Sequence, residues 1–144
     1  MTLGGAVYRL IVRLMARRQF GHLSAGRLDE FMSVFDDRSV FQFAGEHAFG
    51  GELHGAAEIR PVIEKMRQAF SDLTIEATRI LVQGWPWNTV VATQLDVRAT
   101  LPDGTLYRND GLQLLRLRWG KVVEDRVYED TDKLHAALAS MSVA

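Results

Sequence analysis

Apolar residues recur at helical spacing in the first half of the chain and at alternating positions in the second half. The helical spacing predicts three helices, which we place at Leu3 to Gln19, Ser24 to Phe35 and Ala56 to Phe70. The alternation predicts four long strands, at Leu73 to Gln83, Thr89 to Thr100, Leu106 to Trp119 and Lys121 to Asp130. Helical spacing returns at the C-terminal end, from Thr131 to Met141, with Thr131 as a candidate cap.

Glycine and proline residues mark the connections between these elements. Gly21 is expected to end the first helix, since glycine readily adopts the backbone shape of a helix C-cap. A short strand is predicted from Ser39 to Ala44, and the glycine-rich stretch from Gly45 to Gly55 is interpreted as a loop. Pro102 and Gly104 predict a hairpin turn, because proline presets φ and glycine accepts a positive φ.

This order of elements predicts an α+β fold, in which helices gather on one side of a mainly antiparallel sheet. A strongly curved sheet closed on one face by helices forms a cone with a central pocket, which is a natural site for a small molecule. The chain has 144 residues and no repeat, low-complexity segment or linker. We therefore expect one domain that spans residues 1–144.

Composition excludes several classes of function. The net charge of −1 gives no overall attraction to nucleic acid, and the absence of cysteine excludes disulfides and thiolate metal sites. Near the N-terminus, Arg9 and Arg13 interrupt an apolar stretch that is too short to span a bilayer. We interpret it as an amphipathic helix of a cytoplasmic protein that binds no membrane. A membrane-surface helix remains the alternative, because two stripes separate along it: Leu3, Val7, Leu10 and Leu14 on one, and Arg9, Arg13 and Arg17 on the other.

Four segments of the chain resemble SnoaL-like proteins of the nuclear-transport-factor-2-like superfamily. They are residues 36–45, 50–59, 103–109 and 120–131. The resemblance implies a cone-shaped domain that acts on, or binds, a small hydrophobic molecule, and a homodimer formed through the outer face of the sheet. Because this fold hosts isomerases, cyclases, hydrolases and dehydratases, it does not select one reaction. The alternative is a non-catalytic module for small-molecule binding or dimerisation.

The same resemblance indicates which side chains face the pocket. It places Gln42 where ketosteroid isomerases carry their general base, and Gln113 where they and the cyclases carry a catalytic aspartate. An amide donates and accepts hydrogen bonds but cannot shuttle a proton, so both glutamines are predicted to bind a ligand. Tyr107 and Asn109 are expected on the same strand face as Gln113.

Acidic residues are the candidates for proton transfer. Asp96 and Arg98 share a strand face, and the resemblance to epoxide-hydrolase-like enzymes turns that face inward, with Asp96 as acid or base and Arg98 as its counter-charge. Plain amphipathicity turns the same face outward. Asp125 and Val127 are implied to line the pocket, where Asp125 would have a raised pKa or pair with a nearby arginine. The candidate partners are Arg116 and Arg126.

The histidines of the glycine-rich loop do not indicate a metal site. His47 and His54 are seven residues apart, which matches no ligand spacing that zinc proteins use. We therefore expect no metal and no cofactor. The expected partners are a small hydrophobic ligand or substrate and a second copy of the chain.

Overall fold

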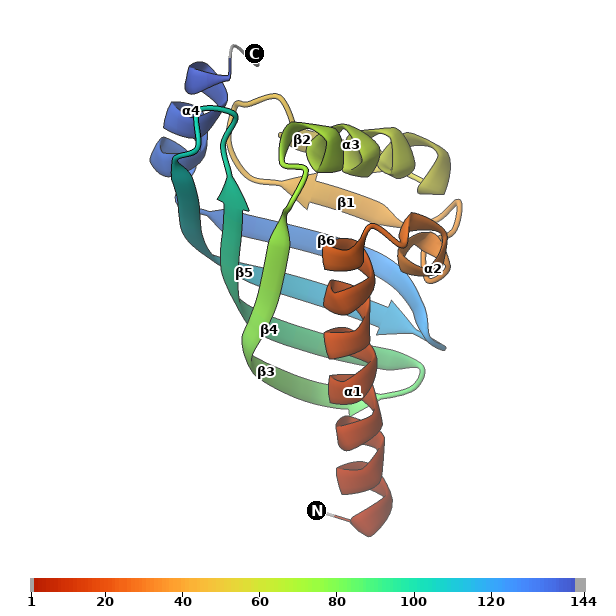
Figure 1. Ribbon diagram of the computed structural model, residues 1–144. Helices are drawn as coiled ribbons and strands as arrows, with labels where there is room; N and C mark the ends of the chain where they lie inside the picture. Colours follow the sequence, from red (N-terminus) through yellow and green to blue (C-terminus); the bar gives the residue numbers. More distant parts are fainter. Residues whose placement is uncertain (1, 142–144) are drawn as a thin grey trace.

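The computed structural model describes residues 2–141 and contains four helices and six strands within them (Figure 1). The helices are α1 (Leu3–Ala25), α2 (Leu28–Met32), α3 (Ala56–Ala69) and α4 (Thr131–Ser140). The strands are β1 (Val40–Phe43), β2 (Gly51–His54), β3 (Thr74–Trp85), β4 (Asn88–Thr100), β5 (Leu106–Arg118) and β6 (Lys121–Glu129).

The six strands form one curled sheet in the order β2-β1-β6-β5-β4-β3. All neighbouring strands are antiparallel except β1 and β6, which run parallel. Between these two strands the chain forms β2, α3, β3, β4 and β5. Helices α1, α2 and α3 lie on one side of this sheet (Figure 1). The predicted α+β fold, with helices on a curved and mainly antiparallel sheet, is confirmed.

The hydrophobic core lies between the concave face of the sheet and the helices. The long strands bury alternate residues, as at Val91, Leu95 and Val97 of β4, because successive side chains of a strand point to opposite faces. Phe20 of α1 and Ile59 of α3 cover these positions from the helical side. Most charged residues of the same strands are left on the convex, outer face.

Helix α1 is longer than the sequence pattern predicts. It runs past Gly21 to Ala25 and ends at Gly26, which has a φ of 75° and donates its backbone N–H to the carbonyls of the last turn. Ser24 begins no second helix; its hydroxyl accepts a 2.9 Å hydrogen bond from the backbone N–H of Ile75 in β3. This bond fixes the end of α1 against the sheet. Within residues 2–141, no helix is long and apolar enough to cross a membrane.

Strand β2 was not predicted, because residues 45–55 were interpreted as a loop. It pairs antiparallel with β1 at the edge of the sheet and is mostly exposed, so it has no hydrophobic alternation to detect. Gly50 allows the chain to turn tightly before it, since a Cβ at this position would lie 2.2 Å from the carbonyl oxygen of Gly45. At the other end of the chain, Asp130 rather than Thr131 caps α4 and accepts hydrogen bonds from its first N–H groups.

Candidate functional site

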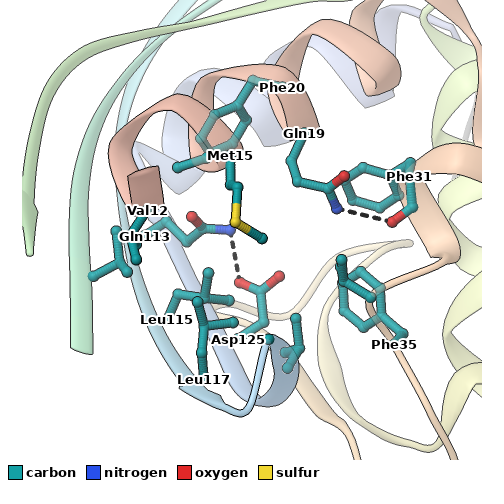
Figure 2. Close-up of a pocket in the computed structure, with 15 residues that line it drawn as sticks. Val12, Met15, Gln19, Phe20, Phe31, Phe35, Gln113, Leu115, Leu117 and Asp125 are labelled. Carbon is teal, nitrogen blue, oxygen red and sulfur yellow. Dashed lines mark hydrogen bonds between the residues drawn. The ribbon is translucent and has the colours of Figure 1, made fainter. Parts of the chain in front are cut away.

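A small cavity of about 50 Å³ lies between α1, α2 and the concave face of β5 and β6 (Figure 2). Its walls are mainly apolar, and they include aromatic and aliphatic side chains from both layers: Val12, Phe20, Phe31, Phe35, Leu115 and Leu117. The polar side chains among its lining residues are Gln19, Gln113 and Asp125. The side-chain amide of Gln19 donates a 2.9 Å hydrogen bond to the backbone carbonyl of Phe31. Gln113 and Asp125 are therefore the polar side chains of the wall that a ligand could meet.

Asp125 lies in the middle of β6 and is 2% exposed. Its Oδ1 atom accepts a hydrogen bond of 3.0 Å from the Nε2 atom of Gln113 on the neighbouring strand. The other carboxyl oxygen points away from Gln113 (Figure 2). Burial raises the pKa of Asp125 to about 7, although the hydrogen bond from Gln113 opposes this effect by favouring the carboxylate.

No cation among the described residues pairs with Asp125. Arg116 and Arg126, which the sequence offers as partners, both form ion pairs with Glu124 on the opposite face of the sheet. The side chain at position 124 points outward because it precedes Asp125 along the strand. The carboxyl of Asp125 is therefore held in an apolar environment by a neutral amide alone.

A second cavity of about 50 Å³ adjoins the first. The two cavities share four lining residues, Phe20, Phe31, Gln113 and Asp125. Val127, which was predicted to bind a ligand, lines this second cavity. The Asp125–Gln113 pair thus lies where the two cavities meet, and the rings of Phe20 and Phe31 line both of them.

Thr93 of β4 is a polar residue of the concave face that was not predicted. It pairs with Gln113 across the β4–β5 ladder and is fully buried. Its hydroxyl oxygen has no hydrogen-bond partner among residues 2–141. A buried hydroxyl without a partner is uncommon, and this one lies next to the amide that holds Asp125.

Tyr107 and Asn109 lie farther along the concave face, away from Asp125. The Asn109 side chain donates hydrogen bonds to the Tyr107 hydroxyl, at 2.8 Å, and to the carbonyl of Asp130, at 2.9 Å. These bonds hold the start of α4 against β5. Tyr107 also lines a cavity of about 20 Å³ together with Glu129, whose pKa is raised by burial to about 7. Glu129 lies on the same strand face as Asp125 and Val127, which was predicted to line the pocket, and it also lines the second cavity at Asp125.

Asp96 and Arg98 lie on the outer face of the sheet, so the prediction that they face the pocket is wrong. Arg98 donates to the carboxylates of Asp96 and Glu76, at 3.0 Å each, and these side chains remain partly exposed. The reason is the amphipathic pattern of β4, in which the apolar Leu95 and Val97 occupy the concave face. The two residues form a surface ion-pair cluster, and we assign them no catalytic role.

Gln42 also lies on the outer face, contrary to the prediction. Its Oε1 atom accepts a hydrogen bond of 2.7 Å from Arg126. Its neighbours Phe41 and Phe43 are buried on the concave side, and alternation along β1 leaves Gln42 on the other side.

The two histidines of the 45–55 segment are separate. His47 packs its ring edge-on against Phe43 at 4.6 Å, and burial lowers the pKa of His47. His54 is exposed beside Glu52. Within the described part of the chain, no group of three or more His, Asp or Glu side chains is placed to hold a metal ion.

Comparisons with known proteins agree with this architecture. The sequence profile of the SnoaL-like domain family matches residues 16–125. A putative isomerase from Bacillus subtilis superposes with a TM-score of 0.72 at 17% identity, over 86% of this chain and 89% of its own. An NTF2-like protein of unknown function from Burkholderia pseudomallei superposes with a TM-score of 0.76 at 13% identity, over 87% of this chain and 95% of its own.

A third similar structure is that of TerC, which was co-crystallised with polyporic acid. It superposes with a TM-score of 0.71 at 16% identity, over 89% of this chain and 97% of its own. Identities this low establish the fold alone. A search of curated protein sequences gave no match. The predicted relationship to SnoaL-like and NTF2-like proteins is confirmed.

Proposed function

Because the chain belongs to the SnoaL-like domain family, we propose that it is an enzyme that transfers a proton on a small hydrophobic molecule. Asp125 is the acid or base of this reaction. The observation that carries the proposal is a buried carboxyl on the wall of an apolar cavity, held by one neutral amide and by no cation among the described residues. Isomerisation, cyclisation and dehydration all contain a step that such a group performs.

The environment of Asp125 suits this role. A general acid or base works best when its pKa lies near the working pH, and burial raises the pKa of Asp125 to about 7. The group then exists in both protonation states at neutral pH. The apolar walls exclude water, which would otherwise compete for the proton and return the pKa to that of a solvated carboxyl.

Gln113 is a positioning residue in this proposal. Its Nε2 atom donates to one oxygen of Asp125, which fixes the plane of the carboxyl and leaves the other oxygen for the ligand. An arginine or lysine at this position would favour the carboxylate far more strongly and lower its pKa. A neutral donor therefore orients Asp125 without suppressing its basicity.

The size of the cavities limits the ligand. Each of the two cavities at Asp125 measures about 50 Å³, whereas sites for drug-sized ligands measure roughly 300–1,000 Å³. A larger ligand must displace the rings of Phe20 and Phe31, which line both cavities. TerC, which was co-crystallised with polyporic acid, supports the proposal that this fold accepts a small organic ligand.

The small size of the two cavities favours a second candidate function. Cavities of only about 50 Å³ lined by phenylalanine side chains are what a non-catalytic binding or dimerisation module would contain. In that case Asp125 is a polar residue of the wall that binds a ligand without turnover. Catalysis distinguishes the two candidates.

Hydrogen–deuterium exchange provides a test that requires no known substrate. A panel of small cyclic ketones is incubated with the protein in heavy water, and incorporation of deuterium next to the carbonyl is measured by mass spectrometry. We expect catalysed exchange of at least one ketone, and a loss of about 100-fold or more in Asp125→Asn, because general acid–base groups contribute about 10²–10⁴-fold.

Asp96→Asn is the matched control, since it is the same substitution on the outer face of the sheet, and exchange should be unchanged. Equal exchange by the wild type and Asp125→Asn would refute the role of Asp125. Binding of the ketones without exchange would establish the non-catalytic alternative.

A further inference from the structure

Helix α1 has two apolar faces. One is buried against the sheet, and the opposite one is exposed. The exposed face comprises Leu3, Val7, Leu10, Ile11 and Leu14, with exposed fractions from 47% to 82%. Their spacing of three, four and seven residues places them in one continuous stripe along the helix. The arrangement is unusual, because a helix at the surface normally presents polar residues to water.

The stripe is open to a large flat partner. Helix α1 lies across the front of the sheet, and its first turns extend beyond the sheet edge, so the side away from the sheet is unobstructed (Figure 1). Five neighbouring aliphatic side chains exceed the scattered single apolar residues that ordinary surfaces carry, and such patches mark contacts with proteins or membranes.

The charge of the helix distinguishes between these partners. No acidic residue occurs before Asp29, whereas α1 carries four arginines: Arg9, Arg13, Arg17 and Arg18. Arg13 and Arg17 flank the stripe and are held there by hydrogen bonds to the carbonyls of Ile80 and Ala77 in β3. Arg18 is exposed at the C-terminal end of the stripe. Arg9 is not part of this border, because one of its guanidinium nitrogens is buried on the sheet side of α1. Arg17 along one side and Arg18 at the end still give the stripe a positive border, which complements an anionic lipid surface.

A second copy of the same helix fits the stripe less well. Two α1 helices packed through their stripes would bring arginines together and no carboxylates. Five side chains of one helix also provide less contact than the roughly 1,200–2,000 Å² that a stable protein interface buries.

We propose that α1 binds the protein to the surface of an anionic lipid bilayer. The helix lies in the plane of the interface, with its apolar stripe at the boundary of headgroups and acyl chains and with Arg17 and Arg18 beside the headgroups. Met15 follows Leu14 directly, is 41% exposed and lines the first cavity, so a wall of the pocket lies beside the bound face. An apolar ligand dissolved in the lipid then reaches the pocket directly, and this last consequence alone rests on the proposed function.

Vesicle co-sedimentation of the full chain tests the proposal. We expect the protein to pellet with vesicles of phosphatidylcholine mixed with phosphatidylglycerol at low salt. Binding should fall at high salt and should be at least about tenfold weaker to pure phosphatidylcholine, because each basic residue near an anionic surface adds about a fivefold preference. Pelleting that is equally strong with both lipids, or absent with both, would overturn the proposal.

Two variants and a matched control locate the contact. Leu10→Glu and Leu14→Glu should each weaken vesicle binding at least about tenfold, since each replaces a lipid-facing leucine by a charge. Leu106→Glu is the control, because Leu106 is more exposed than Leu14 and lies at the start of β5, and its binding should equal that of the wild type. Circular dichroism confirms that all three variants fold. Wild-type binding by both helix variants would overturn the proposal.

A fluorescent label supplies an independent measurement. The chain has no cysteine, so Val7→Cys carries a single environment-sensitive dye on the stripe, and Thr105→Cys carries it in the exposed β4–β5 turn. The Val7 label should shift to the blue with mixed vesicles and the Thr105 label should not. If instead light scattering shows an oligomer that Leu14→Glu dissociates, and no label responds to lipid, the stripe binds a second copy and the proposal is wrong.

Discussion

Replacement of Asp125 by asparagine is expected to stabilise the folded chain above neutral pH. The substitution keeps the shape of the side chain and an oxygen that accepts the hydrogen bond from Gln113, which is 3.0 Å long in the wild type. It removes the charge that the wild type must bury at high pH. The expected gain is therefore confined to the pH range in which Asp125 is ionised.

The pKa of Asp125 gives both the magnitude and the sign of this effect. Its pKa is about 7 in the folded chain and 3.8 in its ordinary solvated state. Between these values the folded chain holds a proton that the unfolded chain has lost, so the free energy of unfolding falls as the pH rises. The full difference is about 4 kcal/mol, at about 1.4 kcal/mol per pH unit. Below pH 3.8 Asp125 does not lower the free energy of unfolding, and above a pH of about 7 it lowers that free energy by the full difference.

Urea unfolding at pH values from about 4 to about 8, followed by tryptophan fluorescence, measures this difference. The two proteins should be nearly equally stable at the acidic end, and the asparagine variant should be more stable by roughly 2–4 kcal/mol at the basic end. Glu129 and His47 also titrate, but both proteins contain them and their effects cancel in the difference. A difference that does not change with pH would show that water reaches Asp125 and that its pKa is ordinary.

Three further expectations concern other parts of the molecule. The outer face of the sheet exposes Leu81, Leu112, Leu114 and Tyr128; we predict a homodimer through this face, and Leu114→Arg should give the monomer mass in light scattering where the wild type gives twice that mass. Phe31→Ala should join the two cavities at Asp125, cost about 3–5 kcal/mol in urea unfolding and strengthen the binding of an apolar dye, whereas unchanged dye binding would contradict our account of the cavities. Gly84→Ala should lower the melting temperature, because a Cβ there would lie 2.2 Å from the carbonyl oxygen of Asn88 at a φ of 100°; an unchanged melting temperature would show that the turn adapts.

The long elements could be predicted from the sequence because periodicity alone specifies them. The alternation of β4 and β5 extends over 13 residues in each strand, which leaves little room for another interpretation. The short elements could not be predicted in this way. Strand β2 is stabilised by backbone pairing with β1 and has four residues, most of them exposed, so its side chains show no pattern. Gly21 did not end α1 because tertiary contacts such as that of Ser24 with β3 continue the helix beyond it.

The site was harder to predict, because alternation shows which residues share a face and not which face is concave. Gln113, Asp125 and Val127 line the cavities, whereas Gln42 and Asp96 lie on the outer face. For β4 the hydrophobicity of the strand gave the right direction, and the residue positions transferred from distant relatives gave the wrong one. A displacement of one residue in such a transfer turns every side chain of a strand to the opposite face.

The cost of burying Asp125 is the strongest reason to look for a function at this position. A leucine or an asparagine there would remove a penalty that approaches the lower end of the whole stability of an ordinary domain, about 5–15 kcal/mol. The structure provides nothing among the described residues that offsets this penalty apart from one amide hydrogen bond, because the nearby arginines serve Glu124 on the outer face. Ion pairs that only stabilise a fold are arranged in the opposite way, with the charges matched and partly solvated, as Asp96 and Arg98 are. A buried carboxyl without a cationic partner lowers the stability of the fold, and the same burial gives the carboxyl a pKa suited to proton transfer at neutral pH. Active sites commonly combine lower stability with a shifted pKa in this way.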